Sequence, residues 1–222
     1  MGNHAGESEK LADFVRKLGD EFELYKQIDE NYGHIGATIA DAVLQANRDY
    51  EKIVLPRVTT IRNKWCEATT TSALRELLNT ISVCQFLDYR SKERADRFLR
   101  VLDLLIAEGI ENEDELRCWL QTPDSRKKLR AIKGIGPKTA DYFGILVGLA
   151  DAAVDRHLYA FLDEAGISYK NYGEAKEIIN GCADILCIDR ARFDHSIWRY
   201  RRKRSQRNEV RRCDSEVVKV HS

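Results

Sequence analysis

The chain has 222 residues, and 36 lysines and arginines balance 36 aspartates and glutamates, so the formal net charge is zero. This length allows one substantial core or two small lobes, and the zero net charge gives no general indication of a nucleic-acid partner. No apolar run approaches the roughly 20 residues that a membrane-spanning helix needs, so no membrane partner is expected.

Residue usage predicts an all-α protein, because there are only three prolines and little alternation of β-branched residues. The six cysteines are scattered and no signal peptide precedes them, so we expect free thiols and an intracellular, cytoplasmic or nucleoid/nuclear location. Charge is unevenly distributed: the first thirty residues are acid-rich, and residues 199–212 are strongly basic.

The spacing of apolar residues predicts a series of helices in chain order. They cover residues 11–25, 37–46, 53–65, 72–78, 92–107, 112–120, 156–164, 172–186 and 193–200. Residues 31–36 are rich in turn formers and are a plausible boundary between lobes. Residues 201–222 form a basic segment without a core face, and we expect a disordered tail.

Residues 129–149 predict a helix-hairpin-helix motif. Ile132 ends one amphipathic helix, and Gly134 and Gly136 bracket a short turn, where glycine can adopt a positive φ. Pro137 suits the first position of the next helix, where its missing N–H group is not needed. Such a turn presents backbone N–H groups beside a helix N-terminus, an arrangement that attracts phosphate without reading a base.

Two ionisable residues near this turn indicate covalent chemistry on a nucleotide sugar. Lys138 lies in the first turn of the second helix, where the helix dipole disfavours a cation and eases loss of a proton. Asp155 follows that helix after a short loop. A lysine that becomes a neutral amine, a nearby acid and a phosphate cradle together suit nucleophilic catalysis.

These residues resemble the helix-hairpin-helix (HhH-GPD) DNA glycosylase superfamily, whose members include endonuclease III and the 8-oxoguanine glycosylases. The family pattern is a Gly-x-Gly hairpin, a catalytic lysine two residues later, and an aspartate in a Val-Asp-x-His turn. In this chain the pattern is Gly134, Gly136, Lys138 and the turn at 154–157 that contains Asp155. The resemblance covers residues 35–165.

The resemblance implies two helical lobes with a DNA cleft between them. Residues 35–150 would form a central lobe with the hairpin, and residues 10–34 together with 151–200 would form the second. Lys138 and Asp155 would be the catalytic residues at the mouth of this cleft. The hairpin residues that contact DNA would be Gly134, Ile135, Gly136 and Thr139.

Two further stretches resemble DNA-contacting segments of the family. Gln45 and Asn47 match the stretch that approaches the gap left by an extruded base, although a polar loop between helices explains both equally well. Leu87 or Tyr89 would be the wedge that enters the duplex. The alternative for that loop is an ordinary helix entry with Ser91 as its N-cap.

By resemblance, the protein flips a damaged or modified base out of double-stranded DNA and excises it through a Lys138 Schiff base, after which β-elimination nicks the strand. A monomer is expected, with no catalytic metal and no cofactor beyond one monovalent cation that the hairpin could bind. Many relatives of endonuclease III carry an iron–sulfur cluster on four close cysteines. In this chain only Cys182 and Cys187 are close, so no cluster is expected.

Alternatives from other classes remain open at this stage. Lys138 could be a solvated phosphate contact, and Asp155 could be a helix N-cap. The protein would then be a non-catalytic DNA-binding module or a monofunctional glycosylase that leaves the strand intact. The sequence does not name the excised base.

Overall fold

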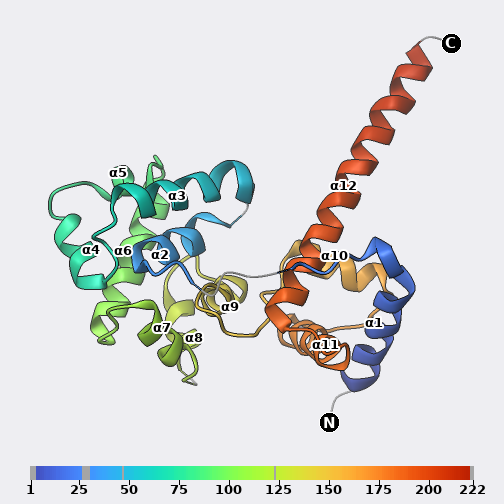
Figure 1. Ribbon diagram of the computed structural model, residues 1–222, viewed down its shortest axis with the longest axis horizontal. Coiled ribbons are helices and arrows are strands. Elements are labelled where there is room, and N and C mark those ends of the chain that lie inside the picture. The colour runs from blue at the N-terminus through green and yellow to red at the C-terminus, as the bar shows by residue number, and fades with distance from the viewer. Residues whose placement is uncertain (1–3, 27–30, 47, 123, 221–222) are drawn as a thin grey trace. The chain divides into compact units, whose positions relative to one another are not determined.

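The computed structural model describes residues 4–26, 31–46, 48–122 and 124–220, with side chains described through residue 205. All regular structure in these ranges is helical, which confirms the all-α prediction. The chain forms two compact units (Figure 1). We call residues 29–149 the hairpin unit, and residues 1–28 together with 150–222 the terminal unit.

The hairpin unit is assembled around α2 (Ile35–Leu44), in which every residue is buried. His34 begins this helix, because its Nδ1 accepts a hydrogen bond from the backbone N–H of Ala37 at 3.1 Å. α2 packs against α3, α6 and α9. The other elements of the unit are η2, a π-helical turn (Tyr50–Val54), α3 (Leu55–Lys64), α4 (Thr71–Leu77), α5 (Val83–Leu87), α6 (Lys92–Ala107), α7 (Glu113–Leu120), α8 (Ser125–Ala131) and α9 (Pro137–Leu146).

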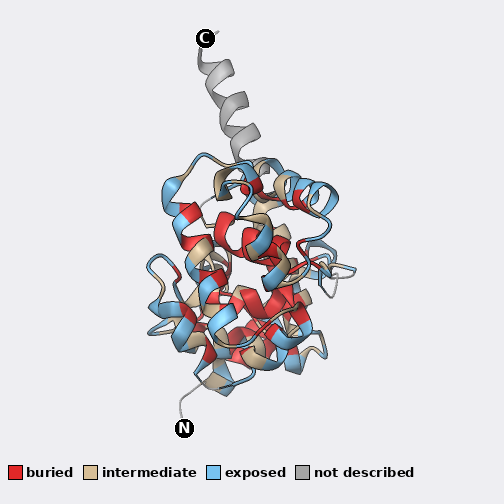
Figure 2. Cartoon of the chain, turned by 90° about the vertical axis from the view of Figure 1, so that its left-hand side faces the viewer, coloured by how far each residue is buried: buried red, intermediate tan, exposed pale blue. Residues whose placement is uncertain are grey.

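The core of the hairpin unit is aliphatic with three buried phenylalanines, Phe86, Phe98 and Phe143. Figure 2 shows the buried positions gathered on the inner sides of its helices. Charged side chains are also buried in this unit, among them Arg94 on α6. Its guanidinium donates to the carbonyl oxygens of Val43 (2.5 Å), Leu44 (2.9 Å) and Ala46 (2.6 Å), so it caps the C-terminus of α2.

The terminal unit has a separate, aromatic core. The rings of Phe22, Phe161, Phe193 and Tyr200 pack with centroids 5.6 to 5.9 Å apart. α1 packs along α11, and α10 packs against α12. The elements of this unit are α1 (His4–Leu18), the 3-10 turn η1 (Gly19–Glu21), α10 (Arg156–Glu164), α11 (Tyr172–Ile185) and α12 (Arg190–Val220).

Two predictions at the chain ends are corrected by the structure. The first helix covers residues 4–18 rather than 11–25, because Gly19 adopts a left-handed conformation (φ +50°) that ends it. Residues 201–220, predicted to be disordered, continue α12 as helix (Figure 1). This stretch is rich in Arg, a good helix former, and contains no Gly or Pro that would end the helix.

Within the described residues, none of the helices combines the length and apolar character that crossing a membrane requires.

The capping role of Arg94 leads to a prediction about the free energy of unfolding. Arg94→Met keeps an apolar stem but removes the donors to three buried carbonyl oxygens, so we expect the free energy of unfolding in urea to fall by about 3 kcal/mol. Arg100→Met, at an exposed position of the same helix, should change it by less than about 0.5 kcal/mol. A loss below about 1 kcal/mol for Arg94→Met would contradict the capping role.

Candidate functional site

The hairpin predicted at 129–149 is present. α8 ends at Ala131, and the turn closes when the N–H of Ile135 donates to the carbonyl oxygen of Ile132 at 3.0 Å. Ile135 is 4% exposed and anchors the turn in the core, while Gly134 and Gly136 face outward. Pro137 then begins α9, so the turn and helix start follow the sequence prediction.

The two hairpin glycines serve different purposes. Gly134 has φ +88°, and a Cβ there would collide with the guanidinium of Arg97, which also donates to the carbonyl oxygen of Lys133 at 3.3 Å. Gly136 has an ordinary φ of −92°, and no described atom lies within 4 Å of the position that its Cβ would occupy. Gly134 is therefore required by the fold, whereas Gly136 leaves open space beside the start of α9.

The monovalent cation that the resemblance allows at this turn stays an expectation. The Arg97 guanidinium packs against Gly134 and forms an ion pair with Glu93 at 2.6 Å. Elsewhere, no group of three or more His, Cys, Asp and Glu side chains gathers as a metal site among the residues that the structure describes.

Lys138 lies in the first turn of α9, half-buried and oriented by two neighbours. Its Nζ donates a hydrogen bond to Oε1 of Gln45, the residue that ends α2. The same Nζ lies 4.3 Å from the centroid of the Tyr142 ring, a cation–π contact. The structure thus brings together Lys138 and Gln45, two residues that the sequence singled out separately. Thr139, the next residue of α9, is half-buried.

A buried carboxylate that the sequence reasoning missed lies beside this lysine. Asp41 of α2 is fully buried and accepts hydrogen bonds from the hydroxyls of Tyr32 (2.6 Å), Tyr142 (3.2 Å) and Tyr50 (3.4 Å). Burial raises the pKa of Asp41 to about 6, against the lowering effect of the tyrosine hydroxyls and of the Lys138 charge. The available signal was a single charged residue in the largely apolar run of residues 35–44.

Two of the tyrosines around Asp41 have raised pKa values and therefore do not act as bases. Burial, followed by the charge of Asp41, raises the pKa of Tyr32 and of Tyr142 above the ordinary tyrosine value. Both hydroxyls therefore remain protonated donors to the carboxylate at neutral pH.

The two residues predicted as wedge candidates differ in exposure. Leu87 is fully buried in the core of the hairpin unit, so Tyr89 is the more accessible of the two. Tyr89 is half-buried and accepts a hydrogen bond from Nε of Arg48 at 2.8 Å, while the guanidinium carbons of Arg57 and Arg94 lie 5.2 and 5.9 Å from its ring centroid.

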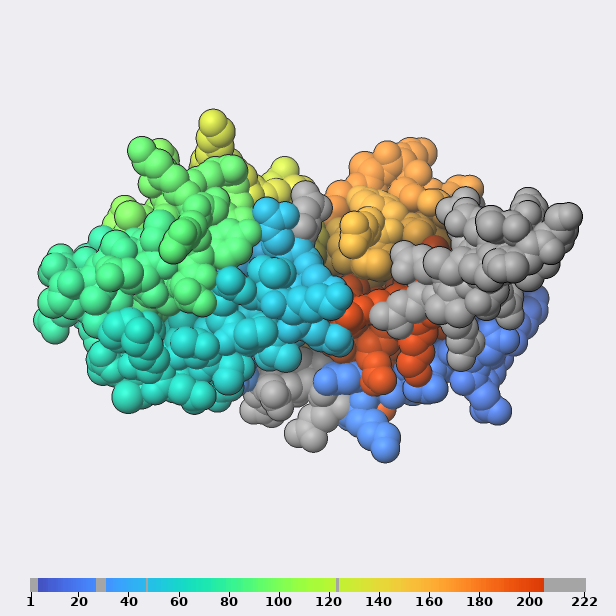
Figure 3. Space-filling view, turned by 90° about the horizontal axis from the view of Figure 1, so that it is seen from above, coloured from blue at the N-terminus to red at the C-terminus, as the bar shows by residue number. Residues whose placement is uncertain are grey.

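The arginines around Tyr89 also alter its ionisation. The Arg48 hydrogen bond is the main cause of a lowered pKa at the Tyr89 hydroxyl. In the space-filling view the cyan segment around residue 50 adjoins the green segment around residues 90–100 (Figure 3). An aromatic ring surrounded by arginines is chemistry that suits nucleic acid. Asn47 lies outside the described residues.

Asp155 begins α10 in the terminal unit. Its Oδ1 accepts hydrogen bonds from the backbone N–H groups of His157 (2.8 Å) and Leu158 (3.1 Å), so the N-cap interpretation is confirmed. Both bonds use the same carboxylate oxygen. The neighbouring His157 has its pKa lowered, mainly by burial, which the charge of Asp155 opposes.

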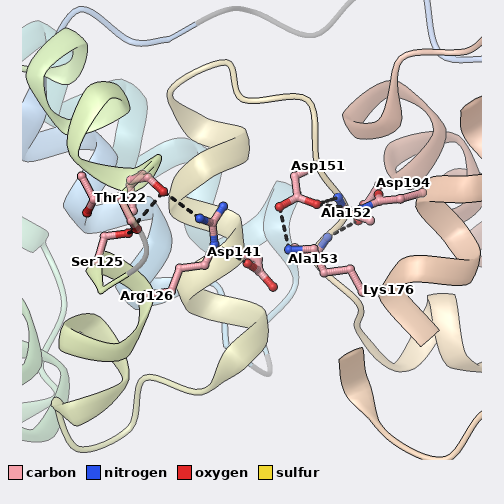
Figure 4. Close-up of polar contacts among 11 residues, drawn as sticks. Thr122, Ser125, Arg126, Asp141, Asp151, Ala152, Ala153, Lys176 and Asp194 are labelled. Carbon is pink, nitrogen blue, oxygen red and sulfur yellow. Dashed lines mark hydrogen bonds and ion pairs between the residues drawn. The ribbon is translucent and has the colours of Figure 1, made fainter. Parts of the chain in front are cut away.

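The segment leading to Asp155 is held by polar contacts from two helices (Figure 4). Asp151 forms an ion pair with Lys176 of α11 at 2.6 Å and accepts a hydrogen bond from Nδ2 of Asn180 at 2.9 Å. Asp194 of α12 accepts from the backbone N–H of Ala153 at 2.8 Å. Residues 151–153 are therefore held against α11 and α12, and they determine where the chain enters α10 at Asp155.

Two solved structures share similarity with most of the chain. One is an 8-oxoguanine DNA glycosylase from Methanocaldococcus jannaschii, 24% identical, with a TM-score of 0.46 over 89% of this chain and 96% of that one. The other is the 8-oxoguanine glycosylase/lyase of the same organism in complex with a 15mer DNA containing 8-oxoguanine, 23% identical, with a TM-score of 0.46 over 87% and 94%. No curated protein sequence matches the chain.

One family model matches residues 9–202, almost the whole described chain. The chain therefore belongs to the family described as a domain of unknown function, DUF8548.

Proposed function

We propose that this protein is a base-excision DNA glycosylase with an associated AP lyase activity, and that Lys138 is its nucleophile. The observation that carries the proposal is the position of Lys138, two residues after an open glycine turn and half-buried against Gln45 and Tyr142. A lysine that serves only as a surface phosphate contact does not need such orientation, since counterion release requires charge but little geometry.

The hairpin supports a DNA-backbone contact beside this amine. Gly136 caps α9 without a side-chain acceptor, and the space beside it is open. A phosphate that approaches the first turn of α9 would meet backbone N–H groups and the positive end of the helix dipole. The resemblance assigns this contact to the residues Gly134, Ile135, Gly136 and Thr139.

The chemistry follows from an amine at that position. The Nζ lone pair of Lys138 forms a bond to C1′ of the deoxyribose, the N-glycosidic bond breaks, and the base leaves with the bonding pair and takes up a proton. The resulting secondary ammonium of Lys138 loses a proton, and the lone pair that this frees on Nζ forms the second bond to C1′. The sugar ring opens as O4′ leaves with its bonding electrons and takes up a proton, which leaves an iminium ion between Nζ and C1′. Loss of a C2′ proton and departure of the 3′ phosphate complete the β-elimination.

Asp155 would stabilise the positive charge that develops on the sugar as the base leaves. The cap uses one carboxylate oxygen, Oδ1, for both of its hydrogen bonds. The negative charge is therefore compatible with capping and with electrostatic catalysis at the same time. Asp155 belongs to the terminal unit, so its role is a separate proposal from that of Lys138.

The nucleophile is tested by borohydride trapping on a duplex that carries one abasic site. Lys138→Gln should abolish the covalent protein–DNA product, because the amide cannot form an imine, while duplex affinity stays within a few fold. Lys133→Gln, at an exposed lysine of the same turn, should trap normally. Trapping that persists in Lys138→Gln and disappears in Lys133→Gln would move the nucleophile to Lys133.

The same assay separates the rival functions. A wild-type protein that is not trapped but excises a base from a lesion panel, and leaves an intact abasic strand, is a monofunctional glycosylase. A protein that binds the duplex and does neither is a DNA-binding module. Either result would refute the proposed lyase.

The glycines provide a matched pair of variants. Gly136→Val should leave the melting temperature close to that of the wild type, because its Cβ meets open space, but should weaken duplex binding by obstructing the phosphate approach. Gly134→Val should instead lower the melting temperature, because its φ is positive and its Cβ collides with Arg97. Unchanged affinity and salt dependence in a folded Gly136→Val protein would argue against a DNA-binding hairpin.

Asp155→Asn tests the electrostatic role. Asparagine retains an oxygen that can cap α10, so the melting temperature should change little. It removes the charge, and single-turnover excision of the best substrate from the lesion panel should fall by roughly 10²–10³. Normal excision by a folded Asp155→Asn protein would reduce Asp155 to a cap.

A further inference from the structure

The buried carboxylate of Asp41 has no part in the reaction as proposed. It comes from the middle of α2, is fully buried, and accepts its hydrogen bonds from tyrosine hydroxyls. A buried carboxylate is costly to keep ionised, and a protein that needed only packing at this position could use an apolar residue. The residues around Asp41 therefore indicate which function its negative charge serves.

Asp41 is coupled to Lys138 through the packing of α2 against α9. Residues 41 and 45 are four apart on α2, and residues 138 and 142 are four apart on α9, so each pair shares one face of its helix. The pairs make two contacts across the interface: Asp41 with the Tyr142 hydroxyl at 3.2 Å, and Gln45 with Lys138 Nζ. The Tyr142 ring links the two contacts, because Lys138 Nζ lies 4.3 Å from its centroid.

We propose that Asp41 is a positioning residue for Lys138: through its hydrogen bond to Tyr142 it fixes the ring on which the Lys138 ammonium rests, and its charge favours that ammonium in the free protein. The proposal rests on the role of Lys138 as nucleophile. The Tyr142 ring face and the Gln45 amide oxygen both support the charged form of the amine, since each of them attracts a cation. Asp41 thus sets the pH range in which Lys138 becomes a nucleophile.

Other charged and titratable groups around this pair are consistent with that assignment. Tyr32 and Tyr50 donate to Asp41, and Tyr50 belongs to η2. α8, which also packs against α9, contributes Arg126, whose Nε pairs with Asp141 at 2.7 Å (Figure 4). The charge of Asp41 and that of Lys138 influence each other reciprocally, and the Lys138 charge lowers the pKa of Asp41 against the larger effect of burial.

The first test measures the titration of Lys138 directly and needs no DNA. The full chain is labelled with [ε-¹³C]lysine, and the Cε signal of Lys138 is identified by its loss in Lys138→Gln. In Asp41→Asn the midpoint of the Lys138 titration should fall by about one pH unit, because an opposite charge nearby typically accounts for a shift of that size. Tyr142→Phe, which keeps the ring but loses the bond to Asp41, should give a smaller shift in the same direction.

The matched control is Asp103→Asn, which removes an exposed carboxylate on α6 of the same unit. It changes the net charge equally and should leave the Lys138 midpoint unchanged. An unchanged midpoint in a folded Asp41→Asn protein would overturn the proposal. If Asp41→Asn does not fold, the wild-type Lys138 signal should still show a second inflection near pH 6, where Asp41 titrates, and absence of that inflection would overturn the proposal equally.

The second test follows the chemistry. The rate of borohydride trapping on an abasic-site duplex is measured against pH for wild type, Asp41→Asn and Asp103→Asn. The acid limb of the profile should move to lower pH by the same amount as the Lys138 midpoint in Asp41→Asn only. A wild-type protein that is never trapped would refute the lyase function and leave the titration result standing, whereas trapping with an unmoved acid limb in Asp41→Asn would overturn the role of Asp41 alone.

Discussion

The packing of α2 against α9 is the interaction on which the candidate chemistry depends. α2 is buried on all sides, so its position is fixed by contacts with α3, α4, α6 and α9. That rigidity places the carboxylate of Asp41 and the amide of Gln45 against the first turns of α9. A lysine side chain has many rotamers, and only a fixed neighbour such as the Tyr142 ring limits where its amine can lie.

The polar groups around α2 are satisfied from several parts of the hairpin unit. Arg94 covers the carbonyl oxygens at its C-terminus, and tyrosines from two other segments and from α9 surround Asp41. Each of these groups would be costly if left without a hydrogen bond in the core. The same arginine borders the Tyr89 ring, so the end of α2 and the surface loop at residues 88–91 are stabilised by one side chain.

In the terminal unit, Asp155 is held in position by contacts within its own helix and by the segment that precedes it. Asp155 is held by its own helix, since the N–H groups at the start of α10 bond to Oδ1. The residues before it are held by Asp151 and Asp194, through contacts with α11 and α12. A cap orients a carboxylate while the charge remains, which is how one residue can serve stability and electrostatics together.

The sequence by itself determined the helical class, the hairpin and the two ionisable residues that follow it, because glycine, proline and capping residues act locally. The Gly134–Pro137 turn and the Asp155 cap are examples. Local signals also misled at the first helix and at residues 201–220, where a left-handed glycine and helix propensity decided the outcome.

Only the tertiary structure decided which of the candidate side chains meet. Leu87 is buried in the core. Gln45 accepts a hydrogen bond from Lys138, which lies 93 positions away in the sequence, and Asp41 accepts one from the Tyr142 hydroxyl. Periodicity assigns a residue to a face of its helix but does not identify the helix that this face will contact. The environment of Lys138 is a product of helix packing, and burial by distant segments is also what raises the pKa of Asp41.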